Sequence, residues 1–514
     1  MKPLSFIALI LFFALNNISF CQSPGTLDLS YGTQGKIKYS TGLEELVIYQ
    51  SAIKNNGSIV LTGKAKLAGG PNENIVVAAL KPDGTPDNTF NGTGYRIVDI
   101  QMTENAGKSL ALQPDGKILI AGWVHNGANF DICLIRLNSD GSFDNGFGTS
   151  GKIVLNLGST EFGMAVDYLS DGKILVTARR YNGVNSDVAL LRFLSNGVLD
   201  NSFGVNGISS KDFSNNNENP YDSSVLPDGS ILVVGDADQS GFSVFFAAKY
   251  SKDGVPVTNF GMNGFTTFQV GAGNNGVSTV KIQNDGKIVI GGYAYEGNET
   301  TLAVVRLNSD GTPDQSFGIS GMVTTNIRDG SEYINDVLIQ KDGKIMVCGV
   351  ARGLTSNSDF TIMRYLSNGT LDVSFGVNGL VTTDFGNTDV AASILSISDD
   401  KFIVVGYSDD KNLVLARYHN DLQSSTNDVD EKFSVNVYPT PVHSVLNISF
   451  YESGDGPVTV ELKNSAGSLV KEISISNLFG NTIQLDLPEN LPLGMYYLLI
   501  KNKQHQSIKK VVVY

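Results

Sequence analysis

The chain has 514 residues, including 56 glycines, 3 cysteines and 1 tryptophan, and its 37 basic and 51 acidic side chains give a net charge of −14. This balance disfavours nucleic acid and anionic membrane surfaces as partners, because both require clustered lysine and arginine. A hydrophobic content of 41% indicates a folded chain rather than a disordered one, and the length allows several large cores.

Residues 1–21 have the pattern of a secretory signal peptide. One lysine precedes an apolar run of about ten residues. This run is too short to span a bilayer, because a transmembrane helix needs about 20 apolar residues. Ser19 and Cys21 are the small residues expected before a cut at Gln22. Acylation of Cys21 is the alternative, but the bulky Phe20 fits a lipoprotein signal poorly. We therefore predict an exported protein without a transmembrane segment.

A repeat of about 57 residues runs through most of the chain. Its first marker is a tight turn followed by an apolar run, as in PDGKILIAG. The turns lie at Asn56, Asp115, Asp171, Asp228, Asp285, Asp342 and Asp399. Its second marker has the form D-x-x-F-G-x-x-G. The copies begin at Asp28, Asp87, Asp144, Asp200, Val257, Asp314 and Asp372.

Each period divides into four short strands rich in valine, isoleucine and leucine. In the third period we expect strands at 152–155, 165–169, 173–177 and 188–194. No long segment has the 3.6-residue apolar spacing of a helix. The pattern predicts an all-β, seven-bladed β-propeller over residues 22–419. A β-solenoid is the alternative, but it requires capping segments that we do not see.

The second marker also predicts how the ring closes. We expect each D-x-x-F-G segment to join the last strand of one blade to the first strand of the next. The copy from Asp28 to Gly35 has no blade before it in the sequence. In a closed ring this copy would fill the junction between the seventh blade and the first.

A basic residue lies eight positions before the aspartate of most second markers. The predicted pairs are Arg136–Asp144, Arg192–Asp200, Arg306–Asp314 and Arg364–Asp372. A planar guanidinium suits a carboxylate, so we interpret these as structural pairs at the blade junctions. Ala79 beside Asp87 breaks the pattern, and a ring of ligand-binding arginines is the alternative. The phenylalanine of each marker is expected to be a wedge between blades.

Cofactor and metal sites have little support in the sequence. Cys133 and Cys348 fall in different blades and are expected to be buried hydrophobic residues rather than a disulfide. The stretches at 138–144 and 308–314 resemble part of a calcium loop, but they lack its bidentate acid and also fit an ordinary turn. We therefore predict no cofactor, with calcium as the alternative at these two loops.

Strand parity assigns the loops to two faces of the ring. The turns of both markers share one face and hardly vary between copies, whereas the other loops share the opposite face and vary freely. Variable loops on a rigid scaffold are the usual place for a binding site. The candidate ligand-binding residues are Trp123, His125, Tyr293 and Tyr295. Ordinary surface variation is the alternative interpretation.

After a polar linker at 420–432, residues 433–514 contain about seven short strands and predict a small immunoglobulin-like β-sandwich. VYPTPVHSVLNI, GMYYLLI and the terminal KKVVVY resemble the type A C-terminal sorting domain of the type IX secretion system, with Thr440 where that family has asparagine. The resemblance implies that residues 433–514 bind the secretion machinery. It also implies an extracellular or outer-surface location in a Gram-negative bacterium.

The repeats, such as ALQPDGKILIAG and LIRLNSDGSFDNGFGTSG, resemble the delta-60 repeat family, which implies a propeller and no particular reaction. We predict a monomeric, non-enzymatic module that binds a glycan or a protein. A propeller enzyme acting on glycans or lactones and a passive scaffold are the alternatives. A channel pocket lined by unlike, acidic residues would favour the enzyme, and repeating small or apolar side chains would favour the other two roles.

Overall fold

The computed structural model describes residues 23–100, 104–327, 330–353, 357–409 and 411–420, and seven shorter stretches within 435–513. These stretches are 435–438, 442–450, 457–464, 468–475, 482–488, 490–501 and 506–513. The chain divides into two compact units, one of residues 23–421 and one that contains residues 422–514. Regular structure in the described ranges is entirely β, so the predicted fold class is confirmed. The predicted signal peptide and most of the linker lie outside the described residues.

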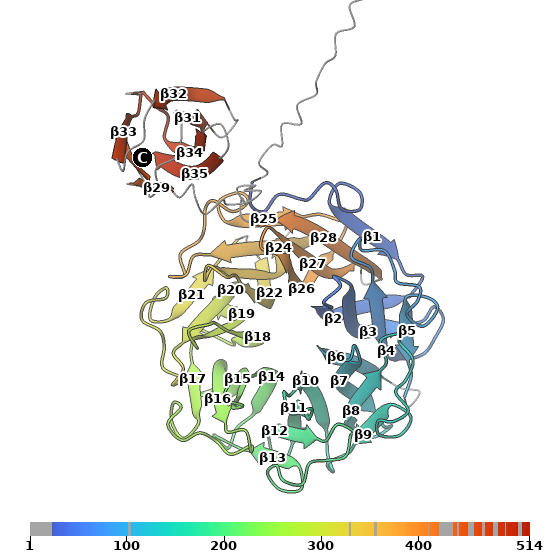
Figure 1. Ribbon diagram of the computed structural model, residues 1–514. Helices are drawn as coiled ribbons and strands as arrows, with labels where there is room; N and C mark the ends of the chain where they lie inside the picture. Colours follow the sequence, from blue (N-terminus) through green and yellow to red (C-terminus); the bar gives the residue numbers. More distant parts are fainter. Residues whose placement is uncertain are drawn as a thin grey trace, which may run out of the picture. The chain divides into compact units, whose positions relative to one another are not determined.

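The larger unit is built from four-stranded antiparallel sheets, each of which we call a blade, arranged in a ring (Figure 1). The first three blades are β2 (Glu45–Ile53), β3 (Ile59–Lys66), β4 (Glu73–Leu80) and β5 (Tyr95–Val98); β6 (Asn105–Leu112), β7 (Ile118–His125), β8 (Phe130–Leu137) and β9 (Lys152–Leu155); and β10 (Glu161–Tyr168), β11 (Ile174–Tyr181), β12 (Ser186–Phe193) and β13 (Ile208–Lys211). In each blade the first strand lies toward the centre of the ring (Figure 1).

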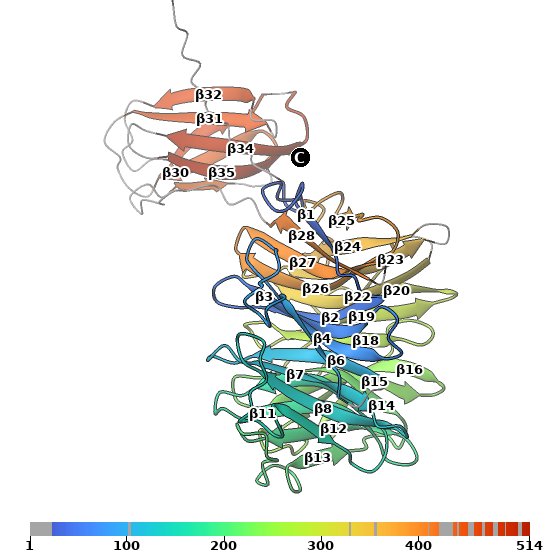
Figure 2. The same ribbon diagram turned by 90° about the vertical axis from the view of Figure 1, so that its right-hand side faces the viewer.

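The chain continues in the same order around the ring. The following blades are β14 (Glu218–Val225), β15 (Ile231–Gln239), β16 (Phe242–Tyr250) and β17 (Phe265–Phe268); β18 (Gly276–Ile282), β19 (Ile288–Glu296), β20 (Glu299–Leu307) and β21 (Met322–Thr325); and β22 (Gly330–Ile339), β23 (Ile345–Gly353), β24 (Ser358–Tyr365) and β25 (Leu380–Thr383). One parallel pair, Thr300 with Ser331, links β20 to β22. The edge-on view shows the blades as successive layers (Figure 2).

The last blade combines the two ends of the unit. It contains β26 (Asp389–Ser398), β27 (Lys401–Ser408), β28 (Asn412–His419) and, as its outer strand, β1 (Lys36–Ser40). Strand β1 pairs antiparallel with β28, and Asp28 N donates to Arg417 O at 2.8 Å. The N-terminal copy of the second marker therefore lies beside the last blade, and the ring is closed by strand pairing.

The expected place of the second marker within a blade was wrong. In the structure the marker joins the third strand of a blade to its own fourth strand, as between β8 and β9. The reason is local: the segment folds back on the strand that precedes it, since Asp144 N donates to Arg136 O at 3.1 Å and Arg136 N donates to Gly151 O at 2.9 Å. The assignment of loops to faces is unaffected, because the parity of the strands is unchanged.

Each marker phenylalanine packs against the following repeat. Phe147 is fully buried, and a Cβ placed on Gly197 of the next blade would lie 2.9 Å from its ring. Gly197 also has φ of +89°, so this position requires glycine on both counts. Phe90, Phe203, Phe260 and Phe317 meet the corresponding glycines at similar distances. These rings are wedges between blades.

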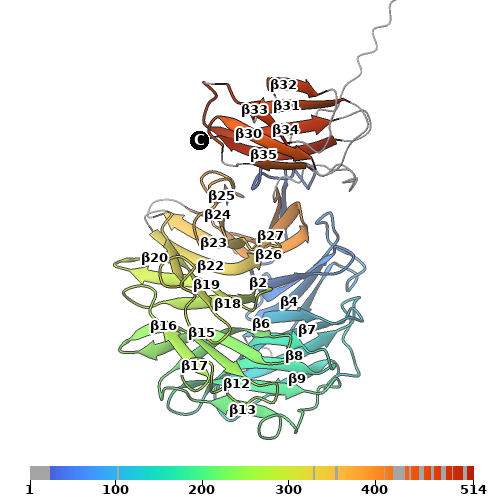
Figure 3. The ribbon, with the colours of Figure 1, turned by 60° about the vertical axis from the view of Figure 1, so that its left-hand side comes forward.

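The C-terminal unit is a small β-sandwich (Figure 3). One sheet contains β29 (Val435–Tyr438), β30 (Val445–Phe450) and β33 (Thr482–Asp486). The other contains β31 (Val458–Asn464), β32 (Leu469–Ile475), β34 (Gly494–Lys501) and β35 (Gln506–Val513). Alternate apolar residues of both sheets, such as Ile448, Val460 and Leu498, form its core. Nowhere in the described ranges does a helix reach the length and hydropathy needed to cross a bilayer.

Candidate functional site

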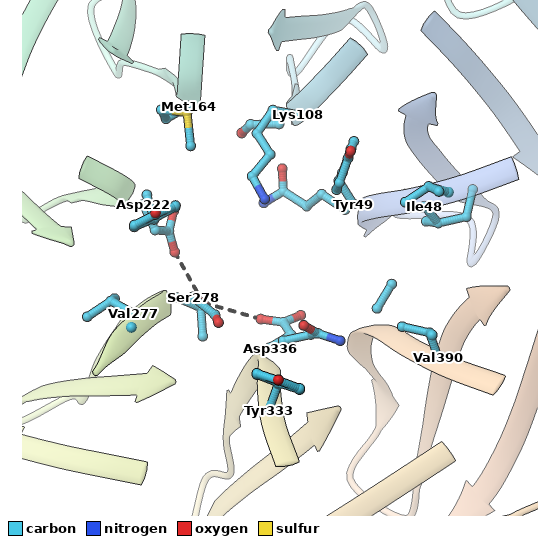
Figure 4. A pocket seen from close by; sticks show the side chains of 18 of the residues that line it. Ile48, Tyr49, Lys108, Met164, Asp222, Val277, Ser278, Tyr333, Asp336 and Val390 are labelled. Atoms are coloured by element: carbon cyan, nitrogen blue, oxygen red, sulfur yellow. Dashed lines mark hydrogen bonds between the residues drawn. The ribbon is translucent and has the colours of Figure 1, made fainter. Parts of the chain in front are cut away.

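The innermost strand of every blade carries a β-bulge at the same place. The pairing of each inner strand with its neighbour shifts by one residue there, and a bulge of this kind re-aims a side chain. The bulge residues are Tyr49, Lys108, Met164, Tyr221, Ser278, Asn335 and Ala392. All of them line one cavity of about 360 Å³ at the centre of the ring. We call this the channel cavity (Figure 4).

The channel cavity lies on the side of the variable loops. Its walls come from the first halves of the inner strands, as at Val47 of β2, and from the last halves of second strands, as at Tyr293 of β19 and Tyr407 of β27. These strand ends meet the variable loops. A second cavity of about 350 Å³ continues along the channel and shares Gln50 and Lys281 with the first.

Tyrosine rings dominate the apolar surface of the channel cavity. The tyrosines are Tyr49, Tyr221, Tyr293, Tyr333 and Tyr407. The rings of Tyr293 and Tyr333 meet edge to face with centroids 5.1 Å apart. Tyr221 is hydrogen-bonded to Asp236, and burial raises the pKa of its phenol. The cavity therefore offers aromatic surfaces together with hydroxyl groups.

Three aspartates line the cavity. Asp236 Oδ2 accepts from Asn219 Nδ2 at 3.1 Å and from Ser243 Oγ at 3.0 Å within its own blade, whereas the other two are held by the neighbouring blades. Asp222 Oδ2 accepts from Val280 N at 2.9 Å and from Thr279 Oγ1 at 3.1 Å. The same Thr279 hydroxyl lies 3.5 Å from Asp336 Oδ1, and both contacts are drawn in Figure 4. Asp336 Oδ2 also accepts from Ile394 N at 3.1 Å. Both carboxylates thus bridge successive blades.

The two lysines of the cavity differ in their partners. Lys281 Nζ lies 3.2 Å from Asp336 Oδ1, and this carboxylate and Asp222 outweigh the effect of burial and raise the lysine's pKa. Lys108 Nζ lies 4.7 Å from the centroid of the Tyr49 ring and forms no ion pair with a described carboxylate. Burial lowers the pKa of Lys108, although the charge of Asp222 opposes this shift. Figure 4 shows Lys108 reaching into the cavity.

Asp167 lines the second cavity, where burial raises its pKa to about 7. Its Oδ2 accepts a hydrogen bond from Ser223 Oγ at 3.0 Å, which opposes the shift.

The predicted arginine–aspartate pairs lie away from the channel, at the contacts between blades. Arg136 Nε donates to Asp144 Oδ2 at 2.8 Å, its Nη1 donates to Ser195 O of the next blade, and its guanidinium lies 4.3 Å from the Phe147 centroid. The equivalent Arg–Asp bonds are 2.8 Å for Arg192–Asp200, 2.7 Å for Arg306–Asp314 and 2.9 Å for Arg364–Asp372. Each arginine thus contacts its own marker and stacks on its own wedge.

The structure adds a fifth pair that sequence spacing does not reveal. Arg417 Nε donates to Asp28 Oδ2 at 2.8 Å across 389 positions of the chain. The same carboxylate receives Lys401 Nζ at 2.9 Å.

Of the four predicted ligand-binding residues, Tyr293 lines the channel cavity. Trp123 lies behind the wall, with its ring 6.3 Å from that of Tyr49 and 5.4 Å from that of Phe162. His125 packs against Phe130 at the outer end of β7, and Tyr295 N donates to Asn275 Oδ1 at 3.2 Å. These three do not line the cavity.

Sequence reasoning missed most of the cavity, although one alignment contains it. The bulge residue lies seven positions before the first-marker turn in every repeat, as Lys108 does before Asp115. The seven positions of this column hold six different residue types, with tyrosine twice. A search for variable positions inside the repeated strands, rather than in the loops, finds it.

Acidic groups elsewhere have structural roles in the described residues. The carboxylates of Asp187, Asp212 and Glu218 cluster at one blade junction, and those of Asp359, Asp384 and Asp389 cluster at another. Glu218 accepts from Phe213 N at 3.1 Å and Asp389 accepts from Phe385 N, so both anchor the loop between blades.

At the loop 138–144, where calcium was the alternative to a turn, Asp140 Oδ1 accepts from Ser142 N at 2.9 Å and from Ser142 Oγ at 2.6 Å, which is the geometry of a turn. Cys133 and Cys348 are buried free thiols.

Solved structures with a similar arrangement are distant in sequence. A polysaccharide lyase described as an ulvan lyase is 11% identical, with a TM-score of 0.42 over 78% of this chain and 96% of the lyase. Sqt1 from Chaetomium thermophilum is 11% identical, with a TM-score of 0.40 over 76% of this chain and 98% of Sqt1. A protein of unknown function from Dyadobacter fermentans is 12% identical, with a TM-score of 0.37 over 75% of this chain and 99% of that protein. Likeness at this level carries no argument about activity.

Family models match both units of the chain, whereas no curated protein matches it. The repeats match a domain of unknown function (DUF5122) described as a β-propeller, at residues 54–90, 113–147, 169–203, 226–260, 283–317 and 340–375. Residues 436–514 match the secretion system C-terminal sorting domain, which indicates export and contact with the secretion machinery. The chain is thus a β-propeller of DUF5122 repeats that carries a C-terminal sorting domain of the type IX secretion system.

Proposed function

We propose that this protein is an extracellular binding module that holds a saccharide in the channel cavity. The observation that carries the proposal is the ring of unlike bulge side chains, because a purely structural channel has no reason to differ from blade to blade. The cavity volume of about 360 Å³ falls in the range of small-ligand sites, roughly 300–1,000 Å³.

The side chains of the cavity suit a saccharide. Sugar rings present apolar C–H faces and many hydroxyl groups, and tyrosine offers an apolar ring with a polar tip. Tyr333 is 36% exposed and its ring meets that of Tyr293 edge to face. Asn335 and Gln50 also line the cavity, and each uses one amide atom for the next blade, since Asn335 Nδ2 donates to Ala391 O at 2.9 Å and Gln50 Oε1 accepts from Leu110 N at 2.7 Å. The sorting domain at residues 436–514 supports export of the protein. We propose that the signal peptide is cleaved and that the protein reaches the outer cell surface, where saccharides are available.

An enzyme remains the second candidate because the channel is lined by unlike, partly acidic residues. A lining of this kind favours a glycan-cleaving propeller. However, the carboxylates of Asp222 and Asp336 are occupied by hydrogen bonds from neighbouring blades. Carboxylates held in this way are poor candidates for proton transfer, so binding is the better supported role. Lys108, with its lowered pKa beside Tyr49, is the group that would serve an enzyme.

The test uses the mature chain, residues 22–514, on an array of neutral and acidic oligosaccharides, followed by calorimetry on the best ligand. We expect Tyr333→Ala to weaken binding by about tenfold, because it removes one aromatic face. Tyr181→Ala is the matched control, since Tyr181 is 39% exposed at the end of β11 and does not line the cavity. Binding that survives Tyr333→Ala unchanged, or no binding at all, overturns the proposal. Product release from the bound oligosaccharide would establish the enzyme instead.

A further inference from the structure

Lys108 has an unusual position for a cation within the blades. It is the bulge residue of β6, so its side chain is directed into the channel rather than along the sheet. It is half-buried, and its ammonium group faces the Tyr49 ring at 4.7 Å. A cation in such a place loses hydration, and a ring face replaces only part of it.

Lys281, the other lysine of the channel cavity, and the junction arginines have carboxylate partners close by. Lys281 lies 3.2 Å from Asp336, and the guanidinium groups of Arg192 and Arg306 lie 2.8 Å and 2.7 Å from their aspartates. No ion pair of this kind joins Lys108 to a described carboxylate. Among the described residues, therefore, no carboxylate contacts the ammonium group of Lys108 in the channel cavity.

The nearest acidic groups do not supply that contact. Asp222 lowers the cost of the charge on Lys108 from a distance, but its oxygens accept from Val280 N, Ser223 N and Thr279 Oγ1. Asp336 is bound to Lys281 and to the backbone of two strands. The space in front of Lys108 Nζ thus suits an incoming anion, while Asp222 at the side of the cavity and Asp336 across it are held by their own hydrogen bonds (Figure 4).

We infer that the ligand of the channel cavity is an acidic saccharide, whose carboxylate or sulfate group pairs with Lys108 while its rings lie against the tyrosines. This inference rests on the proposed saccharide-binding function and adds the charge of the ligand.

The experiment measures binding of matched oligosaccharides to the mature chain by calorimetry. The probes are tri-galacturonate, a sulfated galactose trisaccharide and neutral galactotriose. We expect at least one acidic probe to bind about tenfold or more tightly than the neutral one, because a desolvated ion pair contributes at least that much. The two acidic probes distinguish a carboxylate from a sulfate. Affinity for the acidic probe should also fall with salt, and affinity for the neutral probe should not.

Variants locate the charge. Lys108→Met should remove the preference for the acidic probe and leave binding of galactotriose nearly unchanged, whereas Lys108→Arg should keep the preference. Lys252→Met is the control, since Lys252 lies on the surface with its side chain 70% exposed. Equal binding of acidic and neutral probes by the unmodified chain, independent of salt, overturns the inference and leaves the proposed function standing. Failure of all three probes to bind counts against both.

Discussion

The closure of the ring is predicted to depend on the buried carboxylate of Asp28. Its side chain is 5% exposed and receives Arg417 Nε at 2.8 Å, Lys401 Nζ at 2.9 Å and Ser30 Oγ at 2.6 Å. Asp28→Asn keeps the shape and the Ser30 contact but removes the negative charge. Removing one member of a buried ion pair costs about 3 kcal/mol. Because β1 is the first strand of the ring, the loss should appear as detachment of β1 from β28.

Native-state hydrogen exchange is the suitable assay, since it reports local opening. A loss of about 3 kcal/mol corresponds to roughly 100-fold faster exchange of the β1 and β28 amides that pair across the closure. Asp144→Asn is the matched control, because it removes the same kind of pair between β8 and β9, far from the closure. Unchanged exchange of β1 in Asp28→Asn would refute the reasoning. Equal acceleration of β1 in both variants would show a global effect instead.

The same carboxylate gives the closure a pH dependence. Burial raises the pKa of Asp28, but hydrogen bonds from Ser30 and Lys401 and the charge of Arg417 outweigh it and hold the pKa well below its usual value. A group with a depressed folded pKa stabilises the protein above its unfolded pKa, about 3.9, and this contribution is lost as the pH falls. The difference in β1 exchange between the unmodified chain and Asp28→Asn should therefore shrink below about pH 4.

Two further predictions concern the channel and the C-terminal unit. Burial raises the pKa of Asp167 to about 7, so ionisation of this carboxyl group opposes folding as the pH rises from about 4 to 7. The melting temperature of the unmodified chain should therefore decline over that interval, and Asp167→Asn should flatten the decline. An unchanged decline in the variant would contradict the raised pKa of Asp167. Deletion of residues 433–514 in the native host should leave the propeller in the periplasm, as judged by cell fractionation, and normal surface delivery of the truncated chain would refute the role of the sorting domain.

The fold could be predicted from the sequence because each repeat contains several local signals of strands and turns. Turn residues such as Asp171 and Gly172 recur at a fixed spacing, and the apolar runs between them have the length of strands. It was harder to predict which four strands form one blade, since a strand can pair with either of its neighbours in the sequence. The pairing of β8 with β9 depends on backbone bonds such as Arg136 N to Gly151 O, which the residue pattern does not specify.

Most residues of the channel cavity were not among the predicted ligand-binding residues, because variability was sought in the loops. Trp123 and His125 stand out as rare aromatic residues near a variable loop, yet they pack against Phe162 and Phe130. The variation that lines the channel cavity lies within the inner strands, where a bulge changes the direction of one side chain. A bulge is a property of strand pairing, so Lys108 and Tyr221 resemble ordinary strand residues in the sequence.

The bulge also explains how a repeated scaffold holds an unrepeated site. In the first two blades the residue after the bulge connects the blades: Gln50 Oε1 accepts from Leu110 N at 2.7 Å, and Ser109 Oγ accepts from Val166 N at 3.1 Å. The bulge residue itself supplies no such bond in these two blades. At these two positions the bulge side chain can therefore vary without loosening the ring, whereas Asn335, the bulge residue of β22, donates to Ala391 O of the last blade at 2.9 Å. Separation of the two roles at adjacent positions lets Lys108 be replaced as a probe of binding while the blade contacts of Ser109 persist.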